Sequence, residues 1–190
     1  TFGILVISGL FLMMYYKPDV NLAFDSVNYT IMQEVAFGWL FRHMHGVAAS
    51  VVFLIIYIHM FTGIYYGSYK QGREMIWISG MLLFMTFSAA GFSGYMLPWG
   101  QMSYWAAMVI TNLFGGVPVI GDALVVWIRG DFNVADATLT RFFMLHVFLL
   151  PIAIMGLIGL HFYTLRIPHV NNQNAEELDF DAEAEKYLSG

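Results

Sequence analysis

Four apolar segments constrain the fold of this chain more than any other feature of its sequence. A helix needs about 20 apolar residues to cross a bilayer, and lipid admits only helices and closed barrels as spanning structures. Charged residues are 11% of the chain, against about 25% in soluble domains. We therefore predict an all-α integral membrane four-helix bundle, in which the first segment is the second half of a helix whose beginning is missing. The segments cover residues 2–16, 43–66, 75–97 and 138–165.

The remaining parts of the chain are polar or interrupted. Residues 102–137 contain two tryptophans, a proline and scattered Gly and Asp, so we predict short helices in the membrane interface, where Trp is favoured. Residues 20–42 are predicted to form a polar loop with a short helix. We expect a transmembrane domain over residues 1–170 and an acidic extramembrane tail over residues 171–190. Pro151 is expected to kink the fourth span.

Cysteine and basic residues set limits on function. The chain has no cysteine, which excludes disulfides, thiolate chemistry and iron–sulfur ligation by its own residues. No basic patch indicates nucleic-acid binding. Basic residues lie on both sides of the predicted bundle, so the positive-inside rule does not decide its orientation. The six histidines are the only soft nitrogen ligands.

Two histidines lie in the second apolar segment and two in the fourth. His45 and His59 are fourteen residues apart, which on an α-helix returns to within about 40° of the same face, some 21 Å further along. His146 and His161 are fifteen apart, about 60° from the same face. His43 points about 160° away from His59 and is interpreted, like His169, as an interface residue.

The order of the spans pairs these histidines across the bundle. The third segment returns the chain across the membrane, so the second and fourth run in the same direction. His45 then faces His146 near one surface, and His59 faces His161 near the other. Two imidazoles on parallel helices suit the two axial positions of a haem iron. A single intramembrane histidine more often bonds a neighbouring helix, but four that match in face and depth favour two haems.

Two glycines and an arginine support this reading. Gly80 and Gly94 in the third segment are also fourteen residues apart, and glycine lets the edge of a flat macrocycle approach the backbone. Glycine is also common where membrane helices pack. Arg42, one turn before His45, suits a haem propionate, although an interface arginine that reaches toward water is the ordinary alternative.

Several motifs resemble one family over nearly the whole chain. They are G-L-F-L-M-M-Y-Y (9–16), R-H-M-H (42–45), G-I-Y-Y-G-S-Y (63–69), G-Y-M-L-P-W-G-Q-M-S-Y-W-A-A-M-V-I-T-N-L (94–113) and D-A-T-L-T-R-F-F-M-L-H (136–146). The chain resembles the N-terminal half of cytochrome b from the quinol–cytochrome c oxidoreductase complex, respiratory complex III, of bacterial type. The run at 94–113 is the most specific.

The resemblance implies a role for particular residues. His45 and His146 would ligate a low-potential b haem, and His59 and His161 a high-potential one. The implied haem contacts are Gly9, Arg42, Gly80, Gly94 and Arg166. The implied quinol-oxidation pocket comprises Phe92, Tyr95, Met102, Ala106, Val109 and Ile110, an apolar and aromatic set that ordinary packing would also explain.

This sequence departs from the family pattern at three points. The spacing of fifteen in the fourth span matches chloroplast-type and some bacterial relatives, whereas mitochondrial chains have fourteen. Ala106 stands where glycine is usual, which should narrow the quinol pocket. Thr62 replaces a common propionate-binding arginine, and Arg166 is the candidate substitute. The family's second half, which completes the quinol site and most of the quinone-reduction site, is absent here.

The expected function is a two-haem electron path across a bacterial inner membrane. Quinol would be oxidised near the first haem, and one electron would cross both haems to reduce quinone on the other side. The other electron would pass to a Rieske-type iron–sulfur subunit and a c-type cytochrome subunit, within a dimeric complex. The alternatives are a di-haem membrane anchor of a quinone-linked dehydrogenase or reductase, and a non-redox bundle with a histidine proton relay.

Overall fold

The structure is a computed structural model that describes residues 1–70 and 72–166. Within these residues it is helical and contains no strand, which confirms the predicted all-α class. The predicted acidic tail and His169 lie outside the described residues. The elements are α1 Phe2–Met13, α2 Ala23–Asp25, η1 Ser26–Glu34, α3 Gly38–Tyr65, α4 Glu74–Met96, α5 Gln101–Leu113, η2 Phe114–Gly116, α6 Gly121–Arg129, α7 Asp136–Met144, η3 Leu145–Leu149 and α8 Leu150–Arg166.

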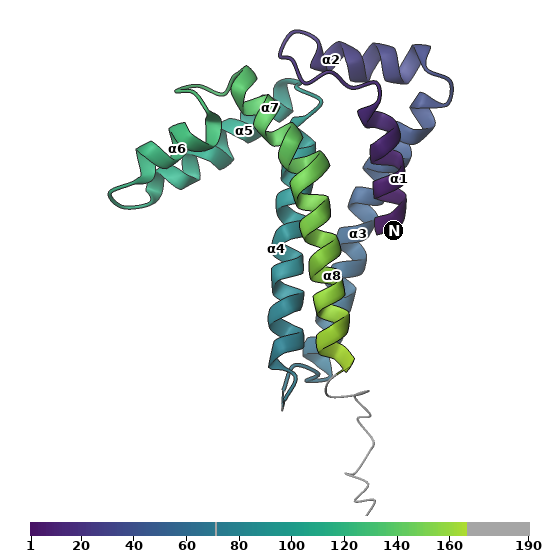
Figure 1. Ribbon diagram of the computed structural model, residues 1–190, viewed down its shortest axis with the longest axis vertical. Coiled ribbons are helices and arrows are strands. Elements are labelled where there is room, and N and C mark those ends of the chain that lie inside the picture. Colours follow the sequence, from purple (N-terminus) through teal and green to yellow (C-terminus); the bar gives the residue numbers. More distant parts are fainter. Residues whose placement is uncertain (71, 167–190) are drawn as a thin grey trace, which may run out of the picture.

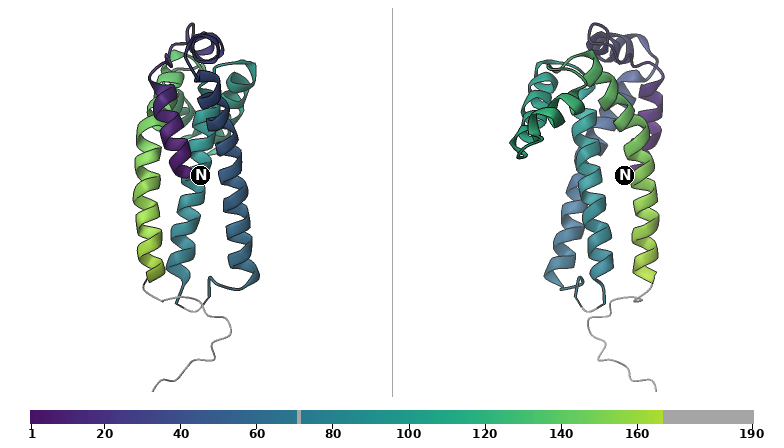
Figure 2. Two further views of the ribbon diagram at one scale, coloured as in Figure 1. Left: turned by 90° about the vertical axis from the view of Figure 1, so that its right-hand side faces the viewer. Right: turned by 60° about the vertical axis from the view of Figure 1, so that its left-hand side comes forward.

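Three helical stretches are long and apolar enough to cross a membrane. They are α3, α4 and the continuous stretch Asp136–Arg166, which joins α7, η3 and α8. Figure 1 and Figure 2 show these three side by side along the long axis, with α1 beside only one end of the bundle. α1 is apolar but has twelve residues, so it is shorter than a full span.

The apolar helices of the bundle associate in two pairs. α4 packs along α8, and α1 packs along α3. α3 and α8 run away from the end that carries α2, while α4 runs back toward it (Figure 1). This is the parallel arrangement that the order of the spans predicts. Few side chains of the long helices are buried within the chain, as expected of helices whose surroundings are lipid or a bound group.

A helical hairpin of α5 and α6 projects sideways from the end of the bundle that also carries α2 (Figure 1). α5 is amphipathic: Ser103, Ala107 and Thr111, spaced four apart, are buried, while Met102 and Val109 are exposed. The buried side joins a small core of Met96, Ala107, Val134 and Phe142. The hairpin corresponds to the short helices predicted between the third and fourth spans.

A tight corner connects α4 to this hairpin. Trp99, directly after Pro98, has a left-handed backbone with φ of 52°, a conformation that non-glycine residues seldom adopt. Two hydrogen bonds hold the corner: the Tyr16 hydroxyl donates to the Leu97 carbonyl at 2.6 Å, and the Ser103 hydroxyl donates to the Tyr95 carbonyl at 2.8 Å. α1, α4 and α5 are therefore fixed relative to one another beside the first pair of histidines.

Candidate functional site

The structure brings the four predicted histidines together in two facing pairs. The ring centres of His45 and His146 lie 6.1 Å apart with an angle of 78° between the rings. Those of His59 and His161 lie 6.3 Å apart at 80°. Each pair joins α3 to the other parallel span, His146 from η3 and His161 from α8. The two sites therefore have nearly the same geometry at two depths of the bundle.

The separation within each pair fits one metal ion between the rings. A metal bound to both rings by nitrogen bonds of about 2.0 Å, with each nitrogen about 1.1 Å from its ring centre, separates the ring centres by about 6.2 Å. Among the described residues no group of three or more His, Asp or Glu side chains is placed to hold a metal. Each pair offers two axial ligands, so a fitting group must bring its own equatorial ligands, as a haem does.

Hydrogen bonds fix the protonation of three of the four rings. Nδ1 of His45 lies 2.9 Å from the Ser8 hydroxyl, which itself donates to the Ile4 carbonyl. His161 and Ser79 repeat this arrangement at 2.9 Å, with Ser79 donating to the Ile76 carbonyl. Since each serine proton is already used, the histidine Nδ1 must carry the proton that it shares. Nε2 is then left with the lone pair that a metal requires.

His146 reaches the same protonation by its bond to a main-chain carbonyl. Its Nδ1 lies 2.9 Å from the Ala90 carbonyl, which only accepts, and 3.5 Å from the Ser93 hydroxyl. Main-chain carbonyls at the equivalent positions, those of Leu5 and Ile76, also bond His45 and His161. No hydrogen bond from the His59 ring is present within the described chain, where His59 is exposed.

The glycines lie against the histidine rings. A Cβ atom added at Gly9 or at Gly80 would come within 3.2 Å of Cε1 of His45 or His161 respectively. At Gly94 it would come within 2.9 Å of Nδ1 of His146, and closer still to Cε1. Glycine was predicted to admit the edge of a macrocycle. In the structure its immediate effect is to make room for the imidazole, because a side chain there would displace the ring.

Three serines contact three of these histidines, and their role was not predicted from the sequence. Ser8, Ser79 and Ser93 are each almost completely buried, with exposures of 0%, 3% and 1%. Each directly precedes one of the glycines against a histidine ring. The signal was present as a Ser-Gly dipeptide that occurs in the apolar segments at 8–9, 79–80 and 93–94, besides one copy at 189–190. A buried hydroxyl needs a hydrogen-bond partner, and the neighbouring ring nitrogen supplies it.

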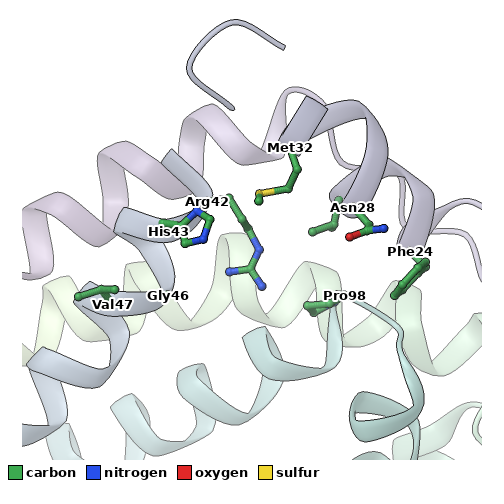
Figure 3. Close-up of a pocket in the computed structure, with 9 residues that line it drawn as sticks. Phe24, Asn28, Met32, Arg42, His43, Gly46, Val47 and Pro98 are labelled. Carbon is green, nitrogen blue, oxygen red and sulfur yellow. The ribbon is translucent and has the colours of Figure 1, made fainter. Parts of the chain in front are cut away.

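Arg42 lies in a cavity near the first pair. The cavity has a volume of about 460 Å³. Figure 3 shows the guanidinium in its centre, between Met32, His43 and Pro98. His43 is exposed, and its Nδ1 donates to the Trp39 carbonyl at 2.7 Å. The other lining residues are Phe24, Val27, Asn28, Gly46 and Val47.

The remaining predicted contacts lie elsewhere. Thr62 donates its hydroxyl to the Ile58 carbonyl of its own helix at 2.7 Å, so within the described chain this proton stabilises α3. Arg166 is the last residue of α8 and is exposed. Its role as the substitute for a propionate-binding arginine remains a prediction.

The predicted quinol pocket falls at the junction of α4 and α5. Met102 and Val109 are 75% and 62% exposed. Phe92 packs edge-on against Phe142 with ring centres 5.6 Å apart, so it also supports the small core. The residues of this set are Phe92, Tyr95, Met102, Ala106, Val109 and Ile110, and their role as a pocket remains a prediction.

A buried arginine ties the hairpin together. Arg129, at the end of α6, is 5% exposed. It donates to the Thr111 hydroxyl at 2.9 Å, to the Asn112 side-chain oxygen at 2.8 Å and to the Phe132 carbonyl at 3.1 Å. These bonds connect the end of α5 to the loop after α6. A guanidinium with its donors in a fixed fork suits such bridging better than an ammonium does.

We expect Arg129→Met to lower the free energy of unfolding by roughly 2–4 kcal/mol, because it removes a buried group that holds three acceptors. Thermal unfolding of the purified protein measures this. Lys17→Met, at an exposed position, is the control and should change stability little. An equal loss in both variants would contradict the bridging role of Arg129.

These features define a multi-pass α-helical membrane protein with two facing-histidine sites inside its bundle. The chain belongs to the cytochrome b/b6/petB family, whose model matches residues 1–168. Membership of this family implies haem binding and a role in electron transfer. The resemblance found in the motifs is thereby confirmed.

Individual relatives agree with this assignment. The chain is 50% identical to cytochrome b of Allochromatium vinosum over 179 residues, which cover 94% of this chain and 42% of that protein. It is 46% identical to cytochrome b/c1 of Bradyrhizobium diazoefficiens over 175 residues, 92% of this chain and 25% of that protein. A solved structure described as a hyperthermophilic respiratory complex III matches with a TM-score of 0.80 and 38% identity, covering 99% of this chain and 55% of that chain. The chain thus spans less than half the length of these two relatives.

Proposed function

We propose that this chain is the haem-carrying part of the cytochrome b subunit of a quinol–cytochrome c oxidoreductase. In this role it oxidises quinol and carries electrons across the membrane through two bis-histidine b haems to reduce quinone, coupled to proton translocation. The observation that carries the proposal is the pair of nearly identical sites, with ring centres 6.1 and 6.3 Å apart.

The chain's own residues bind and orient the two groups. His45 with His146, and His59 with His161, would hold the two haems through their ring nitrogens. Ser8, Ser79 and the Ala90 carbonyl hold the Nδ1 protons of three of these rings, which fixes ring orientation and increases ligand basicity. Iron protoporphyrin, when bound, supplies the reversible one-electron chemistry that side chains lack.

The spacing of the sites suits transfer across the membrane. His59 follows His45 by fourteen positions, about 21 Å along the helix. The ring system of each bound haem would extend well beyond its iron. The edges of the two haems would therefore lie much closer together than about 21 Å. The sites lie toward opposite ends of α3, so an electron that enters at the hairpin end leaves near the other surface. Release and uptake of protons on opposite surfaces then store energy as a membrane potential.

The proposed partners follow from the names of the matched proteins. They also agree with the lack of cysteine ligands for an iron–sulfur cluster in this chain. The solved relative is described as a respiratory complex III, and the Bradyrhizobium diazoefficiens relative as cytochrome b/c1. In this proposal a Rieske-type iron–sulfur subunit receives the first electron and passes it to a c-type cytochrome, and this chain has no cysteine of its own to hold such a cluster. We place the assembly, as a dimer, in a bacterial cytoplasmic membrane.

An optical spectrum and a purification test the proposal. The full-length protein in its purified complex should show a reduced-minus-oxidised b-type haem band equivalent to two haems per chain. Absence of that band would exclude the proposal. Copurification with an iron–sulfur subunit and a c-type cytochrome supports the oxidoreductase, whereas a flavoprotein partner without them would favour the membrane anchor of a dehydrogenase.

A further inference from the structure

The two histidine pairs have equal geometry although their spacings along the chain are unequal. In regular α-helices, a spacing of fourteen turns the second ring by about −40° and a spacing of fifteen by about +60°. The direction of the second ring relative to the first would then differ by about 100° between the two facing helices. Yet the ring centres are 6.1 and 6.3 Å apart and the rings cross at 78° and 80°. One residue between His146 and His161 must therefore be absorbed.

A π-helical turn lies where the extra residue has to be absorbed. η3 covers Leu145–Leu149, and the amide of Leu150 donates to the Leu145 carbonyl, five residues back. A bond to the fifth residue instead of the fourth takes one more residue into the turn. The rest of this interval, α8 from Leu150, is a regular α-helix, as is the whole of α3 between His45 and His59.

Pro151 explains why the turn widens at this point. Proline has no amide hydrogen to donate, and its ring clashes with the carbonyl four residues earlier in a regular helix. That carbonyl belongs to Val147, inside η3. A wider turn moves this carbonyl away from the proline ring, so the proline and the extra residue are accommodated together. Pro151 was predicted to kink this span, and its structural consequence is a π-helical turn before it.

The surroundings of His146 and His161 on α4 show that the two rings share one register. At His161 the Nδ1 atom lies 2.9 Å from the hydroxyl of Ser79, directly before Gly80, and the Ile76 carbonyl, four residues before that glycine, also bonds the ring. At His146 the equivalent groups are Ser93 at 3.5 Å and the Ala90 carbonyl, four residues before Gly94, at 2.9 Å. Both rings therefore contact the same two positions of α4 relative to a glycine, although His161 follows His146 by fifteen positions instead of fourteen.

We propose that the π-helical turn Leu145–Leu149 absorbs the extra residue between His146 and His161 and thereby aims His146 at His45. This rests on the proposed haem function. The turn gives the two sites equal spacing between their histidine rings although the two spans have unequal histidine spacing along the chain.

Deletion of a single residue tests the register. Removing Phe148 from the full-length protein leaves fourteen steps between His146 and His161 and should turn η3 into α-helix, so two haems per chain should remain. Removing Leu54 from α3 is the matched control, because both residues are apolar and exposed, at 62% and 58%. It leaves thirteen steps in a regular helix, rotates His45 by about 100° relative to His59, and should lose one haem.

A second deletion keeps the register test decisive. Removal of Leu149 from the same turn should be tolerated as well as removal of Phe148. If neither deletion variant retains two haems, as counted from the optical spectrum of the purified complex, the register role is wrong. The parent protein would still show both haems in that case, so the haem proposal would stand. A parent protein without b-type haem would overturn the haem proposal itself.

Discussion

His45→Ala is expected to leave one haem per chain in place of the two proposed for the parent protein. Alanine removes one of only two axial nitrogens at the first site, and no third His, Asp or Glu in the described chain is grouped there to replace it. The second site should survive, because His59 and His161 lie about 21 Å further along the helices. The lost haem should be the one of lower potential.

The variant is assessed by haem content and by redox titration of the purified complex. His43→Ala is the matched control: His43 lies two residues away, but it is exposed and bonds the Trp39 carbonyl of its own helix. It should retain both haems. Loss of both haems from the His45 variant would mean that the two sites do not bind independently, and loss of neither would mean that the pairing is wrong.

The choice between these histidines follows from helix geometry, and for that reason the sequence predicted it. His43 and His45 differ by 200° around α3, and only one of the two can face the parallel helix. Hydropathy placed the three long spans to within a few residues of their observed bounds. Both arguments need only a regular helix, and α3 and α4 are regular.

Prediction from the sequence was less successful where a helix is irregular or where a hydrogen-bond partner is a main-chain group. A spacing of fifteen suggested a ring about 60° from its face, because a constant 100° per residue was assumed. The π-helical turn before Pro151 removes that offset. The bond from His146 to Ala90 was also not predictable, since a main-chain carbonyl is present at every residue. The role of the three serines required knowledge of which helices pack together.

The glycines link these local details to the stability of each site. A regular helix gains about 0.5–1 kcal/mol when an interior glycine becomes alanine. At a position against a histidine ring, this gain is opposed by a steric conflict. The severity of this conflict differs among the glycines. An added Cβ atom at Gly156 would have nothing within 4 Å, one at Gly80 would lie 3.2 Å from the His161 ring, and one at Gly94 would lie 2.9 Å or less from the His146 ring.

Gly94→Ala is therefore expected to reduce occupancy of the first site to less than half, while the second site stays full. The added methyl displaces the His146 ring, and this movement breaks its bond to the Ala90 carbonyl and spoils its alignment with His45. Gly80→Ala should have a smaller effect, confined to the His161 site, because the ring there needs to yield by only a few tenths of an ångström.

Gly156→Ala, on the exposed face of α8, is the control and should leave both sites filled. Haem content and the potentials of the retained haems distinguish the three variants. Equal haem content in Gly94→Ala and Gly156→Ala would show that the contact between Gly94 and His146 does not determine haem binding at the first site. Glycine would then serve helix packing alone, which is its commoner role in membrane helices. A graded loss from Gly94 to Gly80 to Gly156 would instead tie these glycines to the orientation of the axial ligands.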